Sequence, residues 1–218
     1  MELDFIPIDY EYFDFEGRNY AKIIGKTKDN KRVCLIDSCD VFFWAILNDK
    51  ISDKRIKELQ HKIEKIKIEN ESRVSKVIKT EIKDKNFLGN KVKAIKIYIT
   101  NHKDADKISE KINEKEIKAI REIDLNYITR YILEKKLIPL TWHSIKGEAI
   151  TNIEDFGGIY NSLDVDILIK VEKITESKTQ HNFIPKVLAI DIETKEFEIG
   201  KGEILMISLV SDGIKKVL

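Results

Sequence analysis

The sequence predicts an α+β protein in which antiparallel sheets alternate with helices. Short runs rich in aromatic and β-branched residues recur between turn signals, which is typical of antiparallel strands. Three other segments repeat apolar residues at spacings of three and four, which is typical of amphipathic helices. With 218 residues, of which 42% are hydrophobic, the chain is long enough to bury one large core or two small ones.

The first forty residues are expected to form successive strands. The runs FIPIDYEYFDF, YAKIIG and RVCLID are separated by turn signals at residues 16–19 and 29–30. The stretch VFFWAIL, residues 41–47, has no polar alternation, so it should be buried either as a helix or as a strand.

A helix and a hairpin are predicted next. Ser52 is a suitable N-cap for an amphipathic helix, and Gly89-Asn90 joins two strands over residues 74–99 that have a solvated face. The apolar stripe of the helix is Ile56, Leu59, Ile63 and Ile66.

Two more helices frame a short strand at residues 117–123. The first begins at Asp104 or Asp106, and the last follows the strand. Their apolar residues are Ile108 and Ile112 in the first, and Leu125, Ile128 and Ile132 in the last. Strand pairs that alternate with helices in this order predict a ferredoxin-like (RRM-like) α/β sandwich.

A domain boundary is expected at Pro139-Leu140, which gives one domain over residues 1–140 and another over 141–218. The second begins with a loop-rich stretch that contains one strand at Asp164–Val171. After Pro185, the runs VLAIDIET, ILMISLV and IKKVL predict a β-meander.

The composition excludes several classes of function. Lys and Arg total 39 and Asp and Glu total 38, so DNA phosphates would have to be met by local basic patches. Basic clusters such as Lys62, Lys65, Lys76 and Lys79 are expected to be solvated faces, because their spacing adds no aromatic stacking platform.

Disulfides, zinc and membranes are also excluded. Cys34 and Cys39 are expected to be reduced thiols, and the four histidines lack the spacing of a zinc site. No run is long enough to span a membrane, and the acidic start is unlike a signal peptide, so a cytoplasmic location is expected.

Asp191 and Glu193 are the strongest candidates for chemistry. Strand alternation puts both carboxylates on one face of VLAIDIET, about 6.5–7 Å apart along the strand, where they can share divalent cations. Taken alone, a D-x-E pair is more often a strand end whose acids face water.

The context of this pair resembles a known family. LAIDIET followed by GKGEILMISLV is similar to the first exonuclease motif of the family B DNA polymerases. VFFWAIL, KNFLGNKVKAIKIYITNHKDADKISEKI and REIDLNYITRYILEKKLIP resemble, in order and spacing, the N-terminal domain of archaeal members. The resemblance implies an N-terminal domain followed by the opening β-meander of an RNase H-like exonuclease fold.

By this resemblance, Asp191 and Glu193 are two ligands of a DEDD-type 3′→5′ exonuclease that holds Mg²⁺ or Mn²⁺, and Glu193 orients the attacking water. The implied chemistry is two-metal, in-line hydrolysis of a phosphodiester. The family takes its other two carboxylates from N-x-x-x-F-D and Y-x-x-x-D segments beyond residue 218. We therefore expect that this chain alone neither polymerises nor degrades DNA.

The resemblance also implies a pocket that reads uracil in the template strand. The positions that match its walls, with Arg130 as a nearby phosphate or base contact, are Tyr10, Val41, Phe42, His102, Ala105, Leu125, Asn126, Tyr127 and Arg130. The family pattern has proline at 41, 102 and 126 and valine at 105. Two lost methyl groups would cost roughly 1–2 kcal/mol, so weak or absent uracil sensing is expected. Core packing is the alternative for Phe42, Leu125 and Tyr127.

The partners implied by the resemblance are a DNA primer-template, the remainder of the polymerase and a sliding clamp, in association with the nucleoid. One alternative is a stand-alone single-stranded DNA-binding or scaffolding module. Another is a complete small nuclease that adds Asp164 and Asp166 to the acidic pair.

Overall fold

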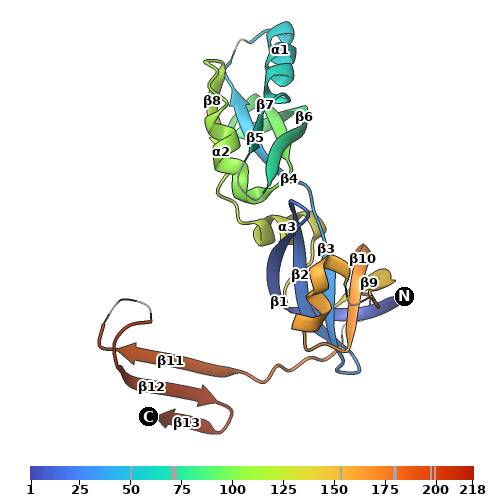
Figure 1. Ribbon diagram of the computed structural model, residues 1–218, viewed down its shortest axis with the longest axis vertical. Coiled ribbons are helices and arrows are strands. Elements are labelled where there is room, and N and C mark those ends of the chain that lie inside the picture. Colours follow the sequence, from blue (N-terminus) through green and yellow to red (C-terminus); the bar gives the residue numbers. More distant parts are fainter. Residues whose placement is uncertain (50, 70–72, 153, 179–180, 197, 199) are drawn as a thin grey trace. The chain divides into compact units, whose positions relative to one another are not determined.

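The computed structural model describes residues 1–218 except 50, 70–72, 153, 179–180, 197 and 199. The chain divides into two compact units, Met1–Gln180 and His181–Leu218 (Figure 1). The predicted boundary at residue 140 lies inside the first unit, between a helix and a strand. Among the described residues, no helix is both long enough and apolar enough to cross a membrane.

A closed five-stranded barrel is the first substructure of unit 1. It follows the order β1-β2-β3-β10-β9, in which β3 and β10 pair in parallel and the other neighbours are antiparallel. The strands are β1 (Glu2–Phe15), β2 (Arg18–Thr27), β3 (Arg32–Asp37), β9 (His143–Ala149) and β10 (Ile167–Glu176). Closure leaves this sheet without an exposed edge strand.

The barrel confirms the predicted N-terminal strands and corrects the region after residue 140. β9 lies in a stretch expected to be loop, and the strand predicted from Asp164 begins at Ile167. Between them lie α4 (Asp155–Gly158) and η2 (Ile159–Ser162). The alternation of β9 is weak in the sequence because His143 is one of its buried residues.

A five-stranded antiparallel sheet is the second substructure, in the order β5-β6-β7-β4-β8. Its strands are β4 (Val41–Leu47), β5 (Lys67–Glu69), β6 (Val74–Phe87), β7 (Asn90–Ile99) and β8 (Ile117–Arg121). All seven residues of β4 are buried, so the open question about residues 41–47 is answered in favour of a strand.

Two helices pack on one face of this sheet. α1 (Asp53–Ile63) begins where the Ser52 hydroxyl accepts a hydrogen bond from the Arg55 amide, as predicted. α2 (Ala105–Glu110) follows the short helix η1 (His102–Asp104). Apolar residues of both helices share a core with alternate residues of the central strands: Phe43, Ala45, Ile56, Leu59, Ile95, Ile97 and Ile108.

Helix α3 (Tyr127–Lys135) turns a different face inward from the one predicted. The expected residues Leu125, Ile128 and Ile132 are only partly buried. Tyr127 and Tyr131 are fully buried instead. Each tyrosine can be buried because its hydroxyl finds an acceptor: Tyr127 donates to the Asn19 carbonyl at 3.0 Å, and Tyr131 donates to the Asp37 carboxylate at 3.0 Å.

Unit 2 is the predicted β-meander. Its strands β11 (Leu188–Thr194), β12 (Ile204–Ser211) and β13 (Ile214–Val217) form an antiparallel sheet in sequence order. No described residue of this unit is buried. The unit therefore presents its side chains to solvent on both faces of a three-stranded sheet.

Candidate metal centre and base pocket

The two candidate metal ligands lie on strand β11. Asp191 pairs across the sheet with Ser208, and Glu193 pairs with Met206, just before a register shift. Successive side chains of a strand point to opposite faces, so residues 191 and 193 share one face, as the sequence predicted. Both carboxylates are exposed.

The surroundings of this pair suit cation binding. Within the described residues, neither carboxylate enters an ion pair or a side-chain hydrogen bond, so their oxygens remain available as ligands for a hard cation such as Mg²⁺. The described part of the chain brings no third Asp, Glu, His or Cys to the pair. The arrangement therefore fits two ligands of a metal site and falls short of a complete one.

Asp164 and Asp166, the acids that the small-nuclease alternative would add, make contacts within unit 1. The Asp164 carboxylate forms an ion pair with Arg32, whose Nη1 lies 2.6 Å from its Oδ2. The Asp166 carboxylate accepts the backbone N–H of Arg32 at 2.7 Å. Both acids thus fasten the start of β10 to the start of β3 in unit 1.

Phe42 and Arg130 are the first pair of predicted pocket residues that the structure brings together. The Arg130 guanidinium lies 3.8 Å from the centroid of the Phe42 ring, although the two residues come from β4 and α3. Arg130 is only 3% exposed and donates to the backbone carbonyl of Glu122 at 3.1 Å. Its position over the ring is therefore fixed by a second contact.

His102 and Tyr127 meet through a residue that the sequence analysis missed. Tyr12 packs edge-on against His102, with ring centroids 6.3 Å apart, and tilted against Tyr127 at 5.5 Å. Tyr10 instead donates its hydroxyl to the Leu137 carbonyl at 3.0 Å. Both tyrosines point to the same side of β1, so the sequence alternation could not tell them apart.

The environment of His102 disfavours protonation of its ring. Burial lowers the pKa of His102 below its usual value, and the positive charge of Arg130 lowers it further. The backbone N–H of His102 donates to the Asn19 side chain at 2.6 Å. His102 is thus a half-buried imidazole whose backbone is held by the Asn19 side chain.

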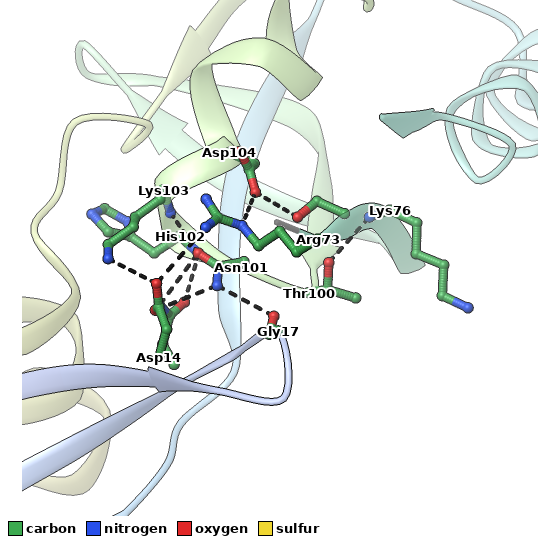
Figure 2. A network of polar contacts seen from close by, with 11 residues as sticks. Asp14, Gly17, Arg73, Lys76, Thr100, Asn101, His102, Lys103 and Asp104 are labelled. Atoms are coloured by element: carbon green, nitrogen blue, oxygen red, sulfur yellow. Dashed lines mark hydrogen bonds and ion pairs between the residues drawn. The ribbon is translucent and has the colours of Figure 1, made fainter. Parts of the chain in front are cut away.

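A polar network holds this segment against the turn between β1 and β2 (Figure 2). The Asn101 side chain donates to the Gly17 carbonyl at 3.2 Å, and the Lys103 ammonium donates to Asp14 at 2.7 Å. On the other side, the Asp104 carboxylate, 1% exposed, accepts from Arg73 Nε at 2.6 Å. The strands of the sheet and of the barrel are thereby joined by charged hydrogen bonds.

The remaining predicted pocket residues are structural. Val41 and Ala105 belong to the core, Leu125 is half-buried, and Asn126 is the exposed N-cap of α3, whose side chain accepts from the Ile128 amide at 2.8 Å. A cavity of about 560 Å³ does open nearby, between the barrel and the sheet. Of the nine predicted residues, only Val41 lines it.

Comparison with known proteins finds similarity to one group of enzymes. The family model described as "DNA polymerase family B, exonuclease domain" matches residues 118–217. A DNA polymerase 1 of Pyrococcus abyssi is 26% identical over 215 residues, which is 97% of this chain and 22% of that protein. A DNA polymerase of Thermococcus sp. strain GE8 is 28% identical over 134 residues, 61% of this chain and 8% of that protein.

A solved structure extends the likeness to the fold. The family B DNA polymerase of the hyperthermophilic archaeon Pyrobaculum calidifontis superposes with a TM-score of 0.65 at 20% identity, over 99% of this chain and 26% of that one. The chain thus spans between 8% and 26% of the length of these relatives.

Proposed function

Similarity along 97% of its length makes this chain a relative of the archaeal family B DNA polymerases, and from that premise we propose that it is the N-terminal region of a polymerase that proofreads with a 3′→5′ exonuclease. The observation that carries the proposal is the placement of Asp191 and Glu193. Both lie on one face of β11, inside the region that matches the exonuclease family model. The alternative of a stand-alone binding module explains neither the pair nor the extent of the similarity.

The proposal includes the finer fold. The order β6-β7-β4-β8, with α1 after β4 and α2 after β7, is the order that a ferredoxin-like sandwich requires, with β5 added at one edge. The meander β11-β12-β13 would be the opening of an RNase H-like exonuclease domain. The proposed domains are residues 1–140 and 141–218, although β9 and β10 close the barrel of unit 1.

We assign Asp191 and Glu193 the role of ligands for Mg²⁺ or Mn²⁺. Bound divalent cations neutralise phosphate oxygens and activate water for in-line hydrolysis. The two exposed carboxylates supply the negative charge that attracts the cations, and Glu193 Oε orients a water toward the 3′-terminal phosphate. Since two carboxylates are half of a DEDD set, this chain alone is expected to leave DNA uncut.

The test has two measurements. Purified chain is incubated with a single strand labelled at its 3′ end in the presence of Mg²⁺, and we expect no trimming. Mn²⁺ binding is then followed by electron paramagnetic resonance in the chain and in Asp191→Asn, where weak binding should be lost. Trimming by the chain alone, or equal Mn²⁺ binding by both proteins, would contradict the assignment.

We also propose that Phe42, Arg130, His102, Tyr127 and Tyr12 are the remnant of a template-base pocket that senses uracil weakly or not at all. Burial of Ala105 in the core supports this, since a side chain that is 5% exposed offers a base almost no surface to contact. Uracil-containing and thymine-containing single strands should bind equally. A clear preference for uracil would overturn the proposal. Uracil preference gained by Ala105→Val, in a variant that unfolds at the wild-type temperature, would support the steric argument.

The proposed partners are a primer-template, the remainder of the polymerase and a sliding clamp, at the nucleoid. The first is the most accessible to measurement, because template binding requires no catalysis. Binding of a primer-template with and without Mg²⁺ separates a phosphate-binding contribution from a metal-dependent one.

A further inference from the structure

The face of the five-stranded sheet opposite α1 and α2 carries a set of rings and cations that come from different strands. Strand register aligns Lys79 with Tyr98 and Phe42 in one row, and Glu81 with Lys96, Trp44 and Arg121 in the next. Lys83 falls in the row of Ala94 and Ile46. We call this surface the basic aromatic face: Phe42, Trp44, Lys79, Lys83, Lys85, Lys96, Tyr98 and Arg121.

Cations lie directly over the rings of this face. Lys96 Nζ lies 3.6 Å from the centroid of Phe42, Lys85 Nζ 3.8 Å from Trp44, and Lys79 Nζ 4.2 Å from Tyr98. Lys79 is exposed, as predicted, but it also lies over an aromatic ring that its sequence spacing does not indicate. The rings come from β4 and β7 while Lys79 comes from β6, so no local spacing could have linked them.

The rings of the basic aromatic face are covered almost entirely by side chains of the sheet itself. The apolar cluster beneath the cations contains residues of β4, β6, β7 and β8 alone among the described residues, and Arg130 of α3 is the added contact on Phe42. Phe42, Trp44 and Tyr98 are only 5–7% exposed because lysine stems lie across them. Flexible side chains can move aside, so the rings are shielded but not enclosed.

Charge and hydrogen bonding both indicate an anionic ligand. Together with Lys85, which pairs with Val92 in the next row, the described residues of these rows include five cations, Lys79, Lys83, Lys85, Lys96 and Arg121, and one anion, Glu81. Glu81 pairs with Lys79 and Lys83, and its charge, with those of Glu134 and Asp40, also acts on Lys96. Even with these three anions counted, the five cations remain in excess.

The indole of Trp44 gives a second, independent indication that a ligand binds this face. Its Nε1–H is buried and has no hydrogen-bond partner within the described residues, although a buried indole N–H normally has one. An acceptor oxygen from a ligand would satisfy this donor.

We propose that the basic aromatic face binds single-stranded DNA, with bases stacking on Trp44, Phe42 and Tyr98 as the lysines move from the rings to the phosphates. Alternating rings and cations match a chain that alternates bases and phosphates. A duplex hides the faces of its bases, and an acidic peptide would leave three rings unused. The choice of DNA rests on the proposed polymerase function, while the choice of a single strand rests on the face.

The first experiment uses Trp44 as its own probe. Trp142→Phe leaves Trp44 as the sole tryptophan of the chain, which has two. Titration with a fluorescent dT oligonucleotide, followed by anisotropy, should be accompanied by saturable quenching of Trp44 emission. Binding without any change in that emission would overturn the proposal and leave the polymerase assignment intact.

The second experiment counts phosphate contacts. Lys79→Gln with Lys85→Gln should reduce the slope of log affinity against log salt by about 1.4, at about 0.7 per contact on single strands. The matched control, Lys54→Gln with Lys57→Gln, removes the same charge from exposed positions on α1 at the opposite face. Equal slopes in both double variants would contradict the proposal.

Trp44→Ala should weaken binding about tenfold, within the range for loss of one stacked base. Trp44→Leu, which keeps an apolar side chain, guards against a variant that fails to fold, and it should weaken binding similarly. If the unaltered chain does not bind dT at all, this proposal fails, whereas the Mn²⁺ measurement at Asp191 decides the metal-ligand role separately.

Discussion

Strands β4 and β11 are both seven residues long and mainly apolar, yet they end in opposite environments. Every residue of β4 is buried, whereas every residue of β11 is exposed. β4 lies between β7 and β8, with helices on one face and the basic aromatic face on the other. β11 lies at the edge of a three-stranded sheet, where Ile190 is 57% exposed and Ile192 is 50% exposed.

The contrast separates two kinds of functional region. Unit 1 buries an apolar core of its own. Side chains of a site in this unit are therefore positioned by packing within this chain. The described residues of unit 2 provide no buried core, so the geometry of Asp191 and Glu193 rests on the ladder between β11 and β12. A metal site needs ligands held within about half an ångström, which a sheet without a core does not guarantee.

The largest expected difference is between two substitutions that each replace a large apolar side chain by alanine, one in β4 and one in β11. Phe43→Ala, at a fully buried position of β4, should destabilise unit 1 by about 3–5 kcal/mol because it opens a cavity in the core. Ile190→Ala in β11 should cost about 1 kcal/mol or less, since little apolar surface is lost from burial. Denaturant unfolding followed by circular dichroism gives both numbers, and equal losses would break the comparison.

Acid should weaken unit 1 through His143. This residue is 1% exposed, its Nε2 lies 3.2 Å from the Ile138 carbonyl, and burial lowers the pKa of its ring. The unfolded chain therefore binds a proton at higher pH than the folded chain does. Stability is fully present above the ordinary histidine pKa of about 6.5 and is lost as the pH falls below it.

The measurement is the unfolding midpoint between pH 7.5 and 5 for the wild type and for His143→Gln. The variant should show a flatter profile, with His102 contributing a remainder of the same sign. His61→Gln, at an exposed position, is the control and should follow the wild type. A wild-type midpoint that rises on acidification would reverse the sign of this argument.

A smaller effect is expected at the start of α1. Ser52→Ala removes the hydroxyl that caps the helix, which should cost about 1 kcal/mol. Ser52→Asp, which can accept the same hydrogen bond, should restore the unfolding midpoint. Failure of aspartate to restore it would indicate that Ser52 acts other than as a cap.

The smallest effect is expected at Asp191. Because its carboxylate is exposed and makes no ion pair within the described residues, Asp191→Asn should leave thermal unfolding of the chain unchanged. The same substitution should abolish Mn²⁺ binding, so loss of a function without loss of stability would mark the residue as a ligand. A large drop in melting temperature would instead assign it a structural role.

The sequence predicted most elements because their signals are local. Ser52 caps a helix with a clear apolar stripe, and the glycine turns mark the hairpins. The strand choice for residues 41–47 could not be made, since a continuous apolar run fits a buried helix equally well. β9 was missed because buried His143 and Gly147 interrupt its apolar pattern; the backbone of β10 comes so close to Gly147 that a Cβ would lie 2.3 Å from the Lys170 carbonyl oxygen.

The metal-ligand pair could be predicted from the sequence and the contacts of the base pocket could not, again because only local patterns can be read from one sequence. Asp191 and Glu193 are two residues apart on one strand, so alternation alone places them on one face. The contact of Phe42 with Arg130, and that of Tyr12 with Tyr127, join residues 88 and 115 positions apart. Such contacts depend on strand pairing and on helix rotation, which single-sequence patterns do not contain.

The parallel pairing of β3 with β10 has a consequence for synthesis of the chain. The barrel cannot close until residues 167–170 have been synthesised and can pair with β3. All five strands of the second sheet lie between β3 and β10 in the sequence. Since domains begin to fold while the ribosome is still adding residues, the sheet with α1 and α2 can assemble first, from neighbouring segments. β1, β2 and β3 would meanwhile form an open sheet with unpaired edges, vulnerable to association with other nascent chains until β9 and β10 emerge.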